Sequence, residues 1–276
     1  MWSNGKRCAV VLTWNFDAEA MWFGALEMDS PGSMERGAYG ARAGFERVMN
    51  LLDSYKVPGT FFVPAWVALN HRAEVERAME LGQEVAYEGF NCESVIGMSV
   101  DEERGLIRRS LKALEEVTGS RPRGARVVPW DHNLHTAKLL LEEGFVYDSS
   151  LMGDDNPYLI DVEGMPEPLI QLPVSWELDD FPFSAYFFGG SNVMLPPDDI
   201  LSLWQTEFDK AYEEGGMFLI TLHPQLIGRR SRIGVLERLI EHMKGRDGVW
   251  FATALDAAQG WREPRRVSWP PVGPST

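Results

Sequence analysis

The sequence is poor in cysteine and in basic residues. Cys8 and Cys92 are its two cysteines, and 26 Lys and Arg stand against 41 Asp and Glu, a net charge of -15. Two cysteines cannot build the disulfide framework of a small secreted domain, and Cys8, within an apolar run, is expected to be a buried packing residue. The lack of basic charge disfavours partners such as nucleic acid or an anionic membrane, because both require a basic surface.

Long hydrophobic runs are missing too. The first apolar run, Cys8–Thr13, is too short to cross a membrane, and residues 1–7 show no small-residue cleavage site. We therefore expect a cytoplasmic protein. Hydrophobic residues make up 45% and charged residues 24% of the chain, which is typical of a folded globular protein. We predict one domain over residues 1–261 and a Pro/Arg-rich tail over residues 262–276, either loose or packed on a neighbouring subunit.

Strand-like runs alternate with helical patterns. The expected strands are Cys8–Phe16, Thr60–Pro64, Glu84–Tyr87, Gly124–Pro129, Phe145–Asp148, Met217–Leu222 and Val249–Ala252. The expected helices are Ala43–Tyr55, Ser99–Thr118 with a capping box at Ser99 and a C-cap at Gly119, Asn133–Glu143, Ser231–Met243, and one that ends near Leu81. Such alternation implies parallel strands joined by right-handed crossovers. We predict an α/β fold, a distorted (β/α) barrel of about seven parallel strands, with an open doubly wound sheet as the alternative.

Two segments depart from this alternation. Met21–Gly40 is rich in Gly and Met and is expected to form a loop over the site. Leu151–Asp199 is rich in Asp, Pro and aromatic residues and is expected to form a long cover over the barrel mouth.

Polar residues cluster where the expected strands end. Asn15 and Asp17 close the first strand, and Glu88 and Cys92 follow the third at a spacing of four residues. Arg126 and Trp130 lie near the end of the fourth strand, and His223 follows the sixth. The carboxyl ends of parallel barrel strands open on one face, where loops build the active site, so we expect these side chains to meet.

The order of several short motifs resembles the polysaccharide deacetylase (NodB-homology) superfamily, more narrowly its cytoplasmic branch of allantoinase-like and cyclic-imide-hydrolase-like proteins. The motifs are Leu12–Glu19, Gly59–Pro64, Gly124–Arg126, Tyr147–Tyr158, Leu172–Asp180, Thr221–Pro224 with Gly228–Arg232, and Gly248–Thr253. The resemblance implies a distorted β/α barrel, a homo-oligomer, and hydrolysis of a non-peptide carbon–nitrogen bond.

The same resemblance exposes departures in the reaction centre. The family's general-base aspartate corresponds to Asn15 and its ligand aspartate to Asp17. The two histidine ligands correspond to Glu88 and Cys92. The arginine and the late histidine survive as Arg126 and His223, but a proline expected shortly after the arginine is Val128. An amide cannot accept a proton at neutral pH, so the usual base is missing.

Three interpretations of this altered site stay open. In the first, Asp17, Glu88 and Cys92 hold zinc, although three negative ligands would weaken it as a Lewis acid. In the second, which we prefer and which needs no cofactor, Glu88 is a base with a pKa raised by burial and by Asp17, and His223 is the acid. Cys92 would be a nucleophile if His223 or Arg126 lowered its pKa.

In the third, the barrel serves a non-hydrolytic lyase, isomerase or cyclase, or an inactive binding module. Arg126, Trp130, Tyr87 and Trp14 are predicted to bind substrate, Arg126 through a developing oxyanion or a carboxylate.

Other residues have simpler explanations. Five tryptophans fall near the predicted site and suggest a partly apolar pocket: Trp14, Trp22, Trp66, Trp130 and Trp176. His132 and His135 are expected to cap a helix at the surface, and the pairs Asp154–Asp155 and Asp179–Asp180 to be solvated or capping. The chain is accordingly predicted to be a hydrolase of a non-peptide carbon–nitrogen bond in a small cyclic or acylated molecule.

Overall fold

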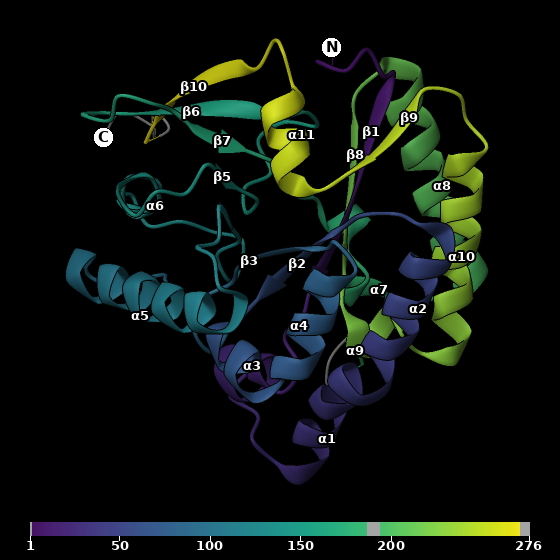
Figure 1. Ribbon diagram of the computed structural model, residues 1–276, viewed down its shortest axis with the longest axis horizontal. Helices are drawn as coiled ribbons and strands as arrows, with labels where there is room; N and C mark the ends of the chain where they lie inside the picture. Colours follow the sequence, from purple (N-terminus) through teal and green to yellow (C-terminus); the bar gives the residue numbers. More distant parts are fainter. Residues whose placement is uncertain (1, 187–193, 271–276) are drawn as a thin grey trace.

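The computed structural model describes residues 2–186 and 194–270, and their strands form one mostly parallel sheet (Figure 1). The strands are β1 (Cys8–Asn15), β2 (Thr60–Val63), β3 (Glu84–Tyr87), β4 (Gly124–Ala125), β5 (Tyr147–Asp148), β6 (Tyr158–Val162), β7 (Leu169–Gln171), β8 (Met217–Leu222), β9 (Val249–Ala252) and β10 (Arg265–Trp269). Their order is β10-β6-β7-β5-β4-β3-β2-β1-β8, with β9 also on β1, and β6 and β7 are the antiparallel pair. The predicted α/β class is confirmed.

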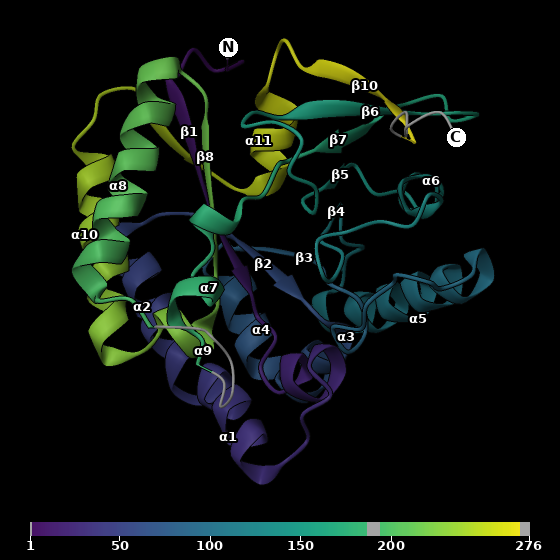
Figure 2. The ribbon, with the colours of Figure 1, turned by 180° about the vertical axis from the view of Figure 1, so that it is seen from behind.

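Helices cover the outer side of this sheet. Figure 2 shows α8 and α10 side by side next to β8. The longer helices are α1 (Pro31–Tyr39), α2 (Phe45–Tyr55), α4 (Arg72–Glu80), α5 (Val100–Thr118), α8 (Pro197–Glu214) and α10 (Arg230–Lys244). The shorter ones are η1 (Met21–Ala25), η2 (Gly40–Gly44), α3 (Ala65–Asn70), α6 (Thr136–Glu142), η3 (Trp176–Leu178), α7 (Phe181–Ser184), α9 (Pro224–Ile227) and α11 (Ala254–Gly260).

The central strand β1 separates an outer core from an inner one. Its even-numbered residues, such as Val10 and Leu12, pack in the larger cluster with the helices. Its odd-numbered Ala9 and Val11 pack in a smaller cluster with residues of the other strands and of α11. Successive side chains of a strand point to opposite faces, so Thr13 and Asn15 also face inward. This alternation places Asn15 inside the ring of strand ends.

The sheet is not closed by a continuous ladder, since β8 is the last strand on one side. A single parallel bridge joins Asp179 to Thr221 on β8. Asp179 lies ahead of α7 on the segment that follows β7, so this bridge brings that segment to the open edge of β8. This bridge places Asp179 and Asp180 beside the end of β8.

The segment expected to form a loop and the segment expected to cover the barrel mouth both contain regular structure. Met21–Gly40 contains η1 and α1, and α1 begins with Ser30 as an N-cap whose hydroxyl accepts from the backbone N–H of Ser33. Leu151–Asp199 contains β6, β7, η3, α7 and the start of α8, while its residues 187–193 lie outside the described part. The Gly- and Met-rich composition of the first segment and the Asp-, Pro- and aromatic-rich composition of the second thus did not prevent helices and strands from forming.

Some boundaries elsewhere follow the sequence closely, but the strand expected over Gly124–Pro129 is reduced to β4 (Gly124–Ala125). Ser99 and Glu102 form the predicted capping box of α5, and Gly119 takes the left-handed C-cap conformation with φ 71°. The tail differs, because Arg265–Trp269 forms β10 and pairs with β6 instead of being loose; residues 271–276 lie outside the described part. No helix within residues 2–186 and 194–270 is long and apolar enough to span a membrane.

An ion pair fastens the segment after β1 to the α3–α4 junction. His71 Nε2 lies 2.7 Å from Glu19 Oε2, and the two side chains are 18% and 15% exposed. The hydrogen bond to Glu19 raises the pKa of His71. Burial alone would raise the pKa of Glu19, but the hydrogen bond and charge of His71 outweigh it and lower that pKa.

This pair predicts a stability contribution that depends on pH. It is complete only above the unfolded pKa of Glu, about 4.3, and below that of His, about 6.5. It is lost as pH rises through the folded pKa of His71. We expect His71→Gln to lower the free energy of unfolding by about 1 kcal/mol near pH 6 and by less near pH 9. Urea denaturation of both proteins at the two pH values, with Glu19→Gln as a parallel variant, measures this; an equal loss at both would contradict it.

Candidate functional site

The structure brings the residues predicted at the ends of β1, β3 and β8 into one buried cluster. Asp17 is fully buried, and Glu88, Cys92 and His223 are at most 2% exposed. The Cys92 thiol donates to Asp17 Oδ1 at 3.6 Å. On the other side, His223 Nε2 lies 3.7 Å from Asp17 Oδ2. Asp17 is therefore the centre on which side chains from three strand ends converge.

Glu88 is held in an environment that favours its neutral form. Burial, followed by the charge of Asp17, raises its pKa well above the ordinary value, and the Arg126 charge only partly opposes this. Burial also raises the pKa of Asp17, but by a shift that His223 and hydrogen-bond donors limit. Since like charges close together cannot both ionise easily, the charge of Asp17 favours the neutral form of Glu88. Within the described residues, Glu88 Oε2 is buried and has no hydrogen-bond partner.

The surroundings of Cys92 disfavour the thiolate form that a nucleophilic cysteine needs. Burial raises the pKa of its thiol well above the usual value, and the charges of Asp17 and Glu88 raise it further. The condition under which Cys92 would be a nucleophile, a pKa lowered by His223 or Arg126, is therefore not met. A nucleophilic cysteine needs a stabilised thiolate, whereas Cys92 is a neutral hydrogen-bond donor to Asp17. Its backbone is left-handed, with φ 58°, in the turn after β3.

His223 is oriented by two aspartates that follow β7. Its Nδ1 lies 2.6 Å from Asp180 Oδ1, and its backbone N–H donates to the same carboxylate. Asp179 Oδ1 is 3.5 Å from Nδ1. Burial lowers the pKa of His223, but the charges of Asp179 and Asp180 outweigh it and raise the pKa to about 9. His223 is thus a charged imidazolium at neutral pH, with Nε2 directed towards Asp17.

Arg126 is committed to the inside of the barrel. Its Nη1 donates to Asn15 Oδ1 at 2.7 Å and to Thr13 Oγ1 at 3.2 Å. Its Nε and Nη2 donate to the carbonyl and the hydroxyl of Ser149, both at 2.9 Å. All three guanidinium nitrogens already have protein partners, which speaks against the predicted role as a substrate anchor. Arg126 instead holds Asn15 and contributes positive charge near Glu88.

The predicted aromatic contacts divide into two groups. Trp14 is fully buried and stacks on Phe61 at 4.9 Å between ring centroids. Tyr87 is 2% exposed and packs on Phe145 at 5.3 Å. Both belong to the outer core, so their expected contact with substrate is wrong. Trp130 stacks at 4.5 Å on the half-exposed Trp176, and its place beside Arg126 remains compatible with contact.

Sequence reasoning undervalued several site residues. Asp179 and Asp180 are expected from the sequence to be solvated or capping. Asp179 Oδ1 does accept from the backbone N–H of Phe181 at the start of α7, but both side chains are buried around His223. Gln225 was not singled out, yet its Nε2 donates to Asp17 Oδ2 at 3.3 Å. His132 was expected at the surface, but it is 9% exposed and lies 3.2 Å from Asp148 Oδ2. The place of Gln225, two residues after the strand-ending His223, was the available signal.

A metal ion would meet a difficult donor set here. Asp179, Asp180 and His223 have ligand atoms within 4.8 Å of one another, so these three could hold an ion; among residues 2–186 and 194–270 no other group meets this condition. Asp17, Glu88 and Cys92, the set expected from the sequence, therefore do not. A metal at Nδ1 of His223 would have to replace its 2.6 Å bond to Asp180. Cys92 and Glu88 both favour their protonated forms. A divalent metal at this place would have to displace the hydrogen bond between His223 and Asp180, or the protons of Glu88 and Cys92.

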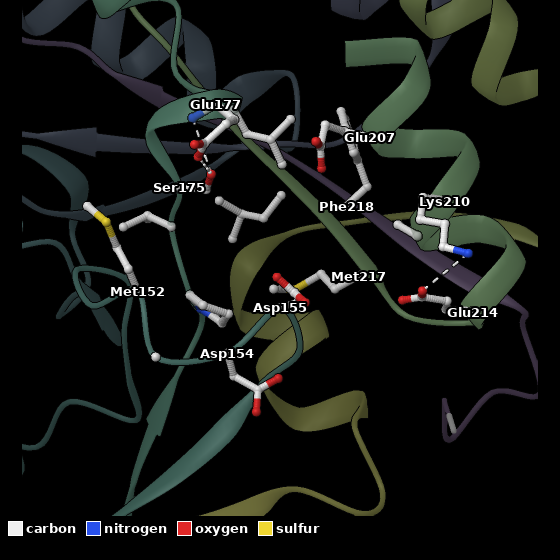
Figure 3. Close-up of a pocket in the computed structure, with 16 residues that line it drawn as sticks. Met152, Asp154, Asp155, Ser175, Glu177, Glu207, Lys210, Glu214, Met217 and Phe218 are labelled. Atoms are coloured by element: carbon white, nitrogen blue, oxygen red, sulfur yellow. Dashed lines mark hydrogen bonds and ion pairs between the residues drawn. The ribbon is translucent and has the colours of Figure 1, made fainter. Parts of the chain in front are cut away.

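A larger cavity of about 470 Å³ lies elsewhere, between α8, the start of β8 and two loops (Figure 3). Acidic side chains line much of it, among them Asp155 and Glu207. Burial, and then the charges of Glu177 and Asp155, raise the pKa of Glu207. The cavity meets β8 at Met217–Leu219, whereas the buried cluster around Asp17 follows the other end of that strand. None of the clustered acid–base groups lines it, so we place the chemistry at the strand ends.

The chain is similar to known proteins over almost its whole length. Residues 35–145 match the model of the family described as polysaccharide deacetylase. A peptidoglycan deacetylase of Helicobacter pylori is 28% identical over 290 residues, covering 95% of this chain and 99% of that protein. The structure of the Puue allantoinase superposes with a TM-score of 0.82 at 26% identity, covering 94% of this chain and 91% of the other.

A protein of Mycobacterium smegmatis, whose name places it among the polysaccharide deacetylases, is more similar still. Its structure superposes with a TM-score of 0.88 at 38% identity, covering 94% of this chain and 91% of that one. Identity of this extent over nearly the full length of both chains establishes the relationship, and the shared scaffold is that of a deacetylase-like hydrolase. The chain belongs to the polysaccharide deacetylase (NodB-homology) family.

Proposed function

We propose that the protein hydrolyses a non-peptide carbon–nitrogen bond of a small cyclic or acylated molecule, with acid–base groups of its own chain and without a metal ion. The observation that carries the proposal is the buried Asp17–Glu88 pair facing the charged His223. Two groups with pKa values displaced by their surroundings are typical of an acid–base pair. The family relationship supports the class of bond.

Each group has a defined part in the reaction. Water attacks the carbonyl carbon while Glu88, in its ionised form, takes one water proton through Oε2. The carbon–nitrogen bond then breaks, and His223 gives the proton on Nε2 to the leaving nitrogen. The products are a carboxylic acid and an amine or amide. Asp180 holds the imidazolium in place, and a raised pKa makes Glu88 a stronger base than an ordinary carboxylate.

A non-hydrolytic enzyme or a binding module is the second candidate. It is supported by Asn15, which by resemblance stands where the family has its base and whose carbonyl oxygen accepts from Arg126. A neutral amide cannot accept the water proton. Assays for hydrolysis and for proton exchange on the same compounds separate the two candidates.

The proposal also covers the substrate, the assembly and the cellular location of the protein. We infer a small-molecule substrate, a homo-oligomer and a cytoplasmic location, with no nucleic acid or membrane partner. The net charge of -15 supports the exclusion of polyanionic partners. Sedimentation of the purified chain tests the oligomer, and fractionation of cells tests the location.

Glu88→Gln should abolish turnover while preserving binding. The amide keeps the shape of the side chain but cannot accept a proton, so we expect hydrolysis to fall by about 10²–10⁴-fold with substrate affinity little changed. The measurement is turnover and equilibrium binding on a panel of N-acetylated sugars, cyclic imides and cyclic ureides, including allantoin. The exposed Glu80→Gln on α4 is the matched control. Undiminished turnover in Glu88→Gln would remove Glu88 as the base.

The alkaline limb of the pH profile of kcat/KM should reflect the deprotonation of His223. The acid must be protonated, so kcat/KM is expected to fall as pH rises through about 9. Asp180→Asn removes one of the two charges that raise this pKa, so its limb should move to lower pH. Asp53→Asn, on the surface of α2, should leave the limb unmoved. A limb at the same pH in Asp180→Asn would contradict the assignment.

Cys92→Ser and Cys92→Ala should both keep most of the activity. A neutral thiol that donates to Asp17 is replaced by a hydroxyl donor in the first variant, and the second loses one weak hydrogen bond. We expect at most about a tenfold loss in the alanine variant. Steady-state kinetics and the metal content by plasma mass spectrometry should be measured together. Complete loss in both variants, together with one tightly held ion per wild-type chain, would restore Cys92 as a metal ligand.

A further inference from the structure

A smaller cavity, of about 310 Å³, adjoins the catalytic cluster and is lined by basic side chains. Arg36 comes from α1, and Arg229 and Arg232 come from the start of α10. Gln225, which donates to Asp17, lines the same cavity. The net charge of the chain is -15, so three arginines around one cavity next to the reaction centre give that cavity an unusual positive potential.

Two of these arginines are held by neutral partners. Arg232 Nε donates to Ser184 Oγ at 2.7 Å. Arg229 Nε donates to the backbone carbonyl of Gln225 at 3.2 Å, and its guanidinium lies 3.4 Å from the centre of the Tyr39 ring. Over the described part of the chain, neither makes an ion pair with a carboxylate, whereas Arg238, further along α10, pairs with Asp198. The charges of Arg229 and Arg232 thus remain available to an anion.

The arginines also repel one another. Burial lowers the pKa of Arg36, and the charge of Arg229 lowers it further. Burial lowers the pKa of Arg232 as well; Asp180 opposes this shift and Arg229 adds to it. Positive groups that destabilise one another are relieved by a bound anion, and a planar guanidinium matches a carboxylate in a bidentate geometry.

Gln225 adds a hydrogen-bond acceptor to the positive charge of the arginines, so the ligand must carry a donor as well as an anionic group. Its side chain is 2% exposed, and Oε1 has no hydrogen-bond partner among the described residues. A carboxylate can only accept, so the amide nitrogen must face Asp17 and Oε1 is left as an acceptor. A buried acceptor without a donor costs about 1–3 kcal/mol, and an N–H group of a ligand would satisfy it.

We propose that this cavity is a carboxylate subsite, and that the substrate is a small N-acyl or N-carbamoyl amino acid or a molecule of the same pattern. Its carboxylate binds to Arg232 and Arg36, with Arg229 at the rim, and its N–H donates to Gln225 Oε1. The scissile bond then lies beside Gln225, at the side of the cavity that is nearest to the Asp17–Glu88 pair and His223. This inference rests on the proposed function, because it names the substrate class of that site.

Binding of charged and uncharged probes tests the subsite without turnover. N-Acetylglycine and N-carbamoylglycine are compared with their methyl esters, which keep the N–H and lose the charge. Isothermal calorimetry on the full chain is expected to show each acid bound at least about tenfold more tightly than its ester. Arg232→Gln should remove this preference, and Arg232→Lys should restore part of it. Equal binding of acid and ester, or no binding of either, would overturn the proposal.

Two variants separate charge from folding. Ser184→Ala removes the hydrogen bond of Arg232 but keeps its charge, so the preference for the acid should persist. Arg238→Gln removes an arginine of α10 outside the cavity and should leave all affinities unchanged. If Arg238→Gln or Ser184→Ala abolished the preference as completely as Arg232→Gln, a general effect of charge or of packing would explain it, and the subsite would be wrong.

These experiments distinguish a failure of the proposed subsite from a failure of the proposed hydrolysis. Preference for the acids with no hydrolysis of any compound on the panel would keep the subsite and reject the hydrolase. Hydrolysis of neutral cyclic amides with no preference for the acids would keep the hydrolase and reject the subsite. Inorganic phosphate is included as a competitor: displacement of N-acetylglycine by millimolar phosphate, with tighter binding than the acid, would assign the arginines to a phosphate group instead.

Discussion

The site is organised by one buried carboxylate. Asp17 has no exposed surface, and moving an isolated charge from water into such a place costs several kcal/mol unless partners surround it. Its partners come from separate parts of the chain: Cys92 after β3, and His223 and Gln225 after β8. Because each partner must present a proton to Asp17, their protonation states are set together. Cys92 stays a thiol, His223 stays charged, and the orientation of the Gln225 amide is fixed.

The barrel scaffold makes this arrangement possible through close backbone contacts. A Cβ at Gly44 would come within 2.0 Å of the Pro224 carbonyl oxygen, and one at Gly228 within 2.4 Å of Gly44 Cα. These glycines let η2 lie directly against α9, the short helix that carries Gln225. Any side chain there would push α9 away from the strand end. The hydrogen bond to Asp17 thus depends on two residues that have no chemistry of their own.

The fold was largely predictable, because apolar runs and caps are local signals. Val249–Ala252 and the capping box at Ser99 are examples where propensity and tertiary packing agree. The site was predictable where residues follow recognisable strands, as with Glu88 and His223. The prediction of the site failed for Trp14 and for Asp180. Side chains of β1 alternate between its two faces, and this alternation turns Trp14 towards the helices. The position of Asp180 depends on a bridge between Asp179 and Thr221, some forty residues apart, which no local pattern encodes.

The substitutions in the reaction centre compensate one another in charge. By resemblance, Asn15 replaces a carboxylate and Glu88 replaces a neutral or cationic imidazole, so the number of carboxylates among these positions is unchanged. A carboxyl group has thus moved from the end of β1 to the turn after β3. Arg126 explains why the first change is tolerated, since its Nη1 now donates to the amide oxygen of Asn15, and its charge still opposes the rise in the pKa of Glu88. An aspartate at position 15 would instead pair with Arg126 and neutralise it. Glu88 would then be harder to ionise, so the asparagine at position 15 favours the ionised form that the proposed reaction requires of Glu88.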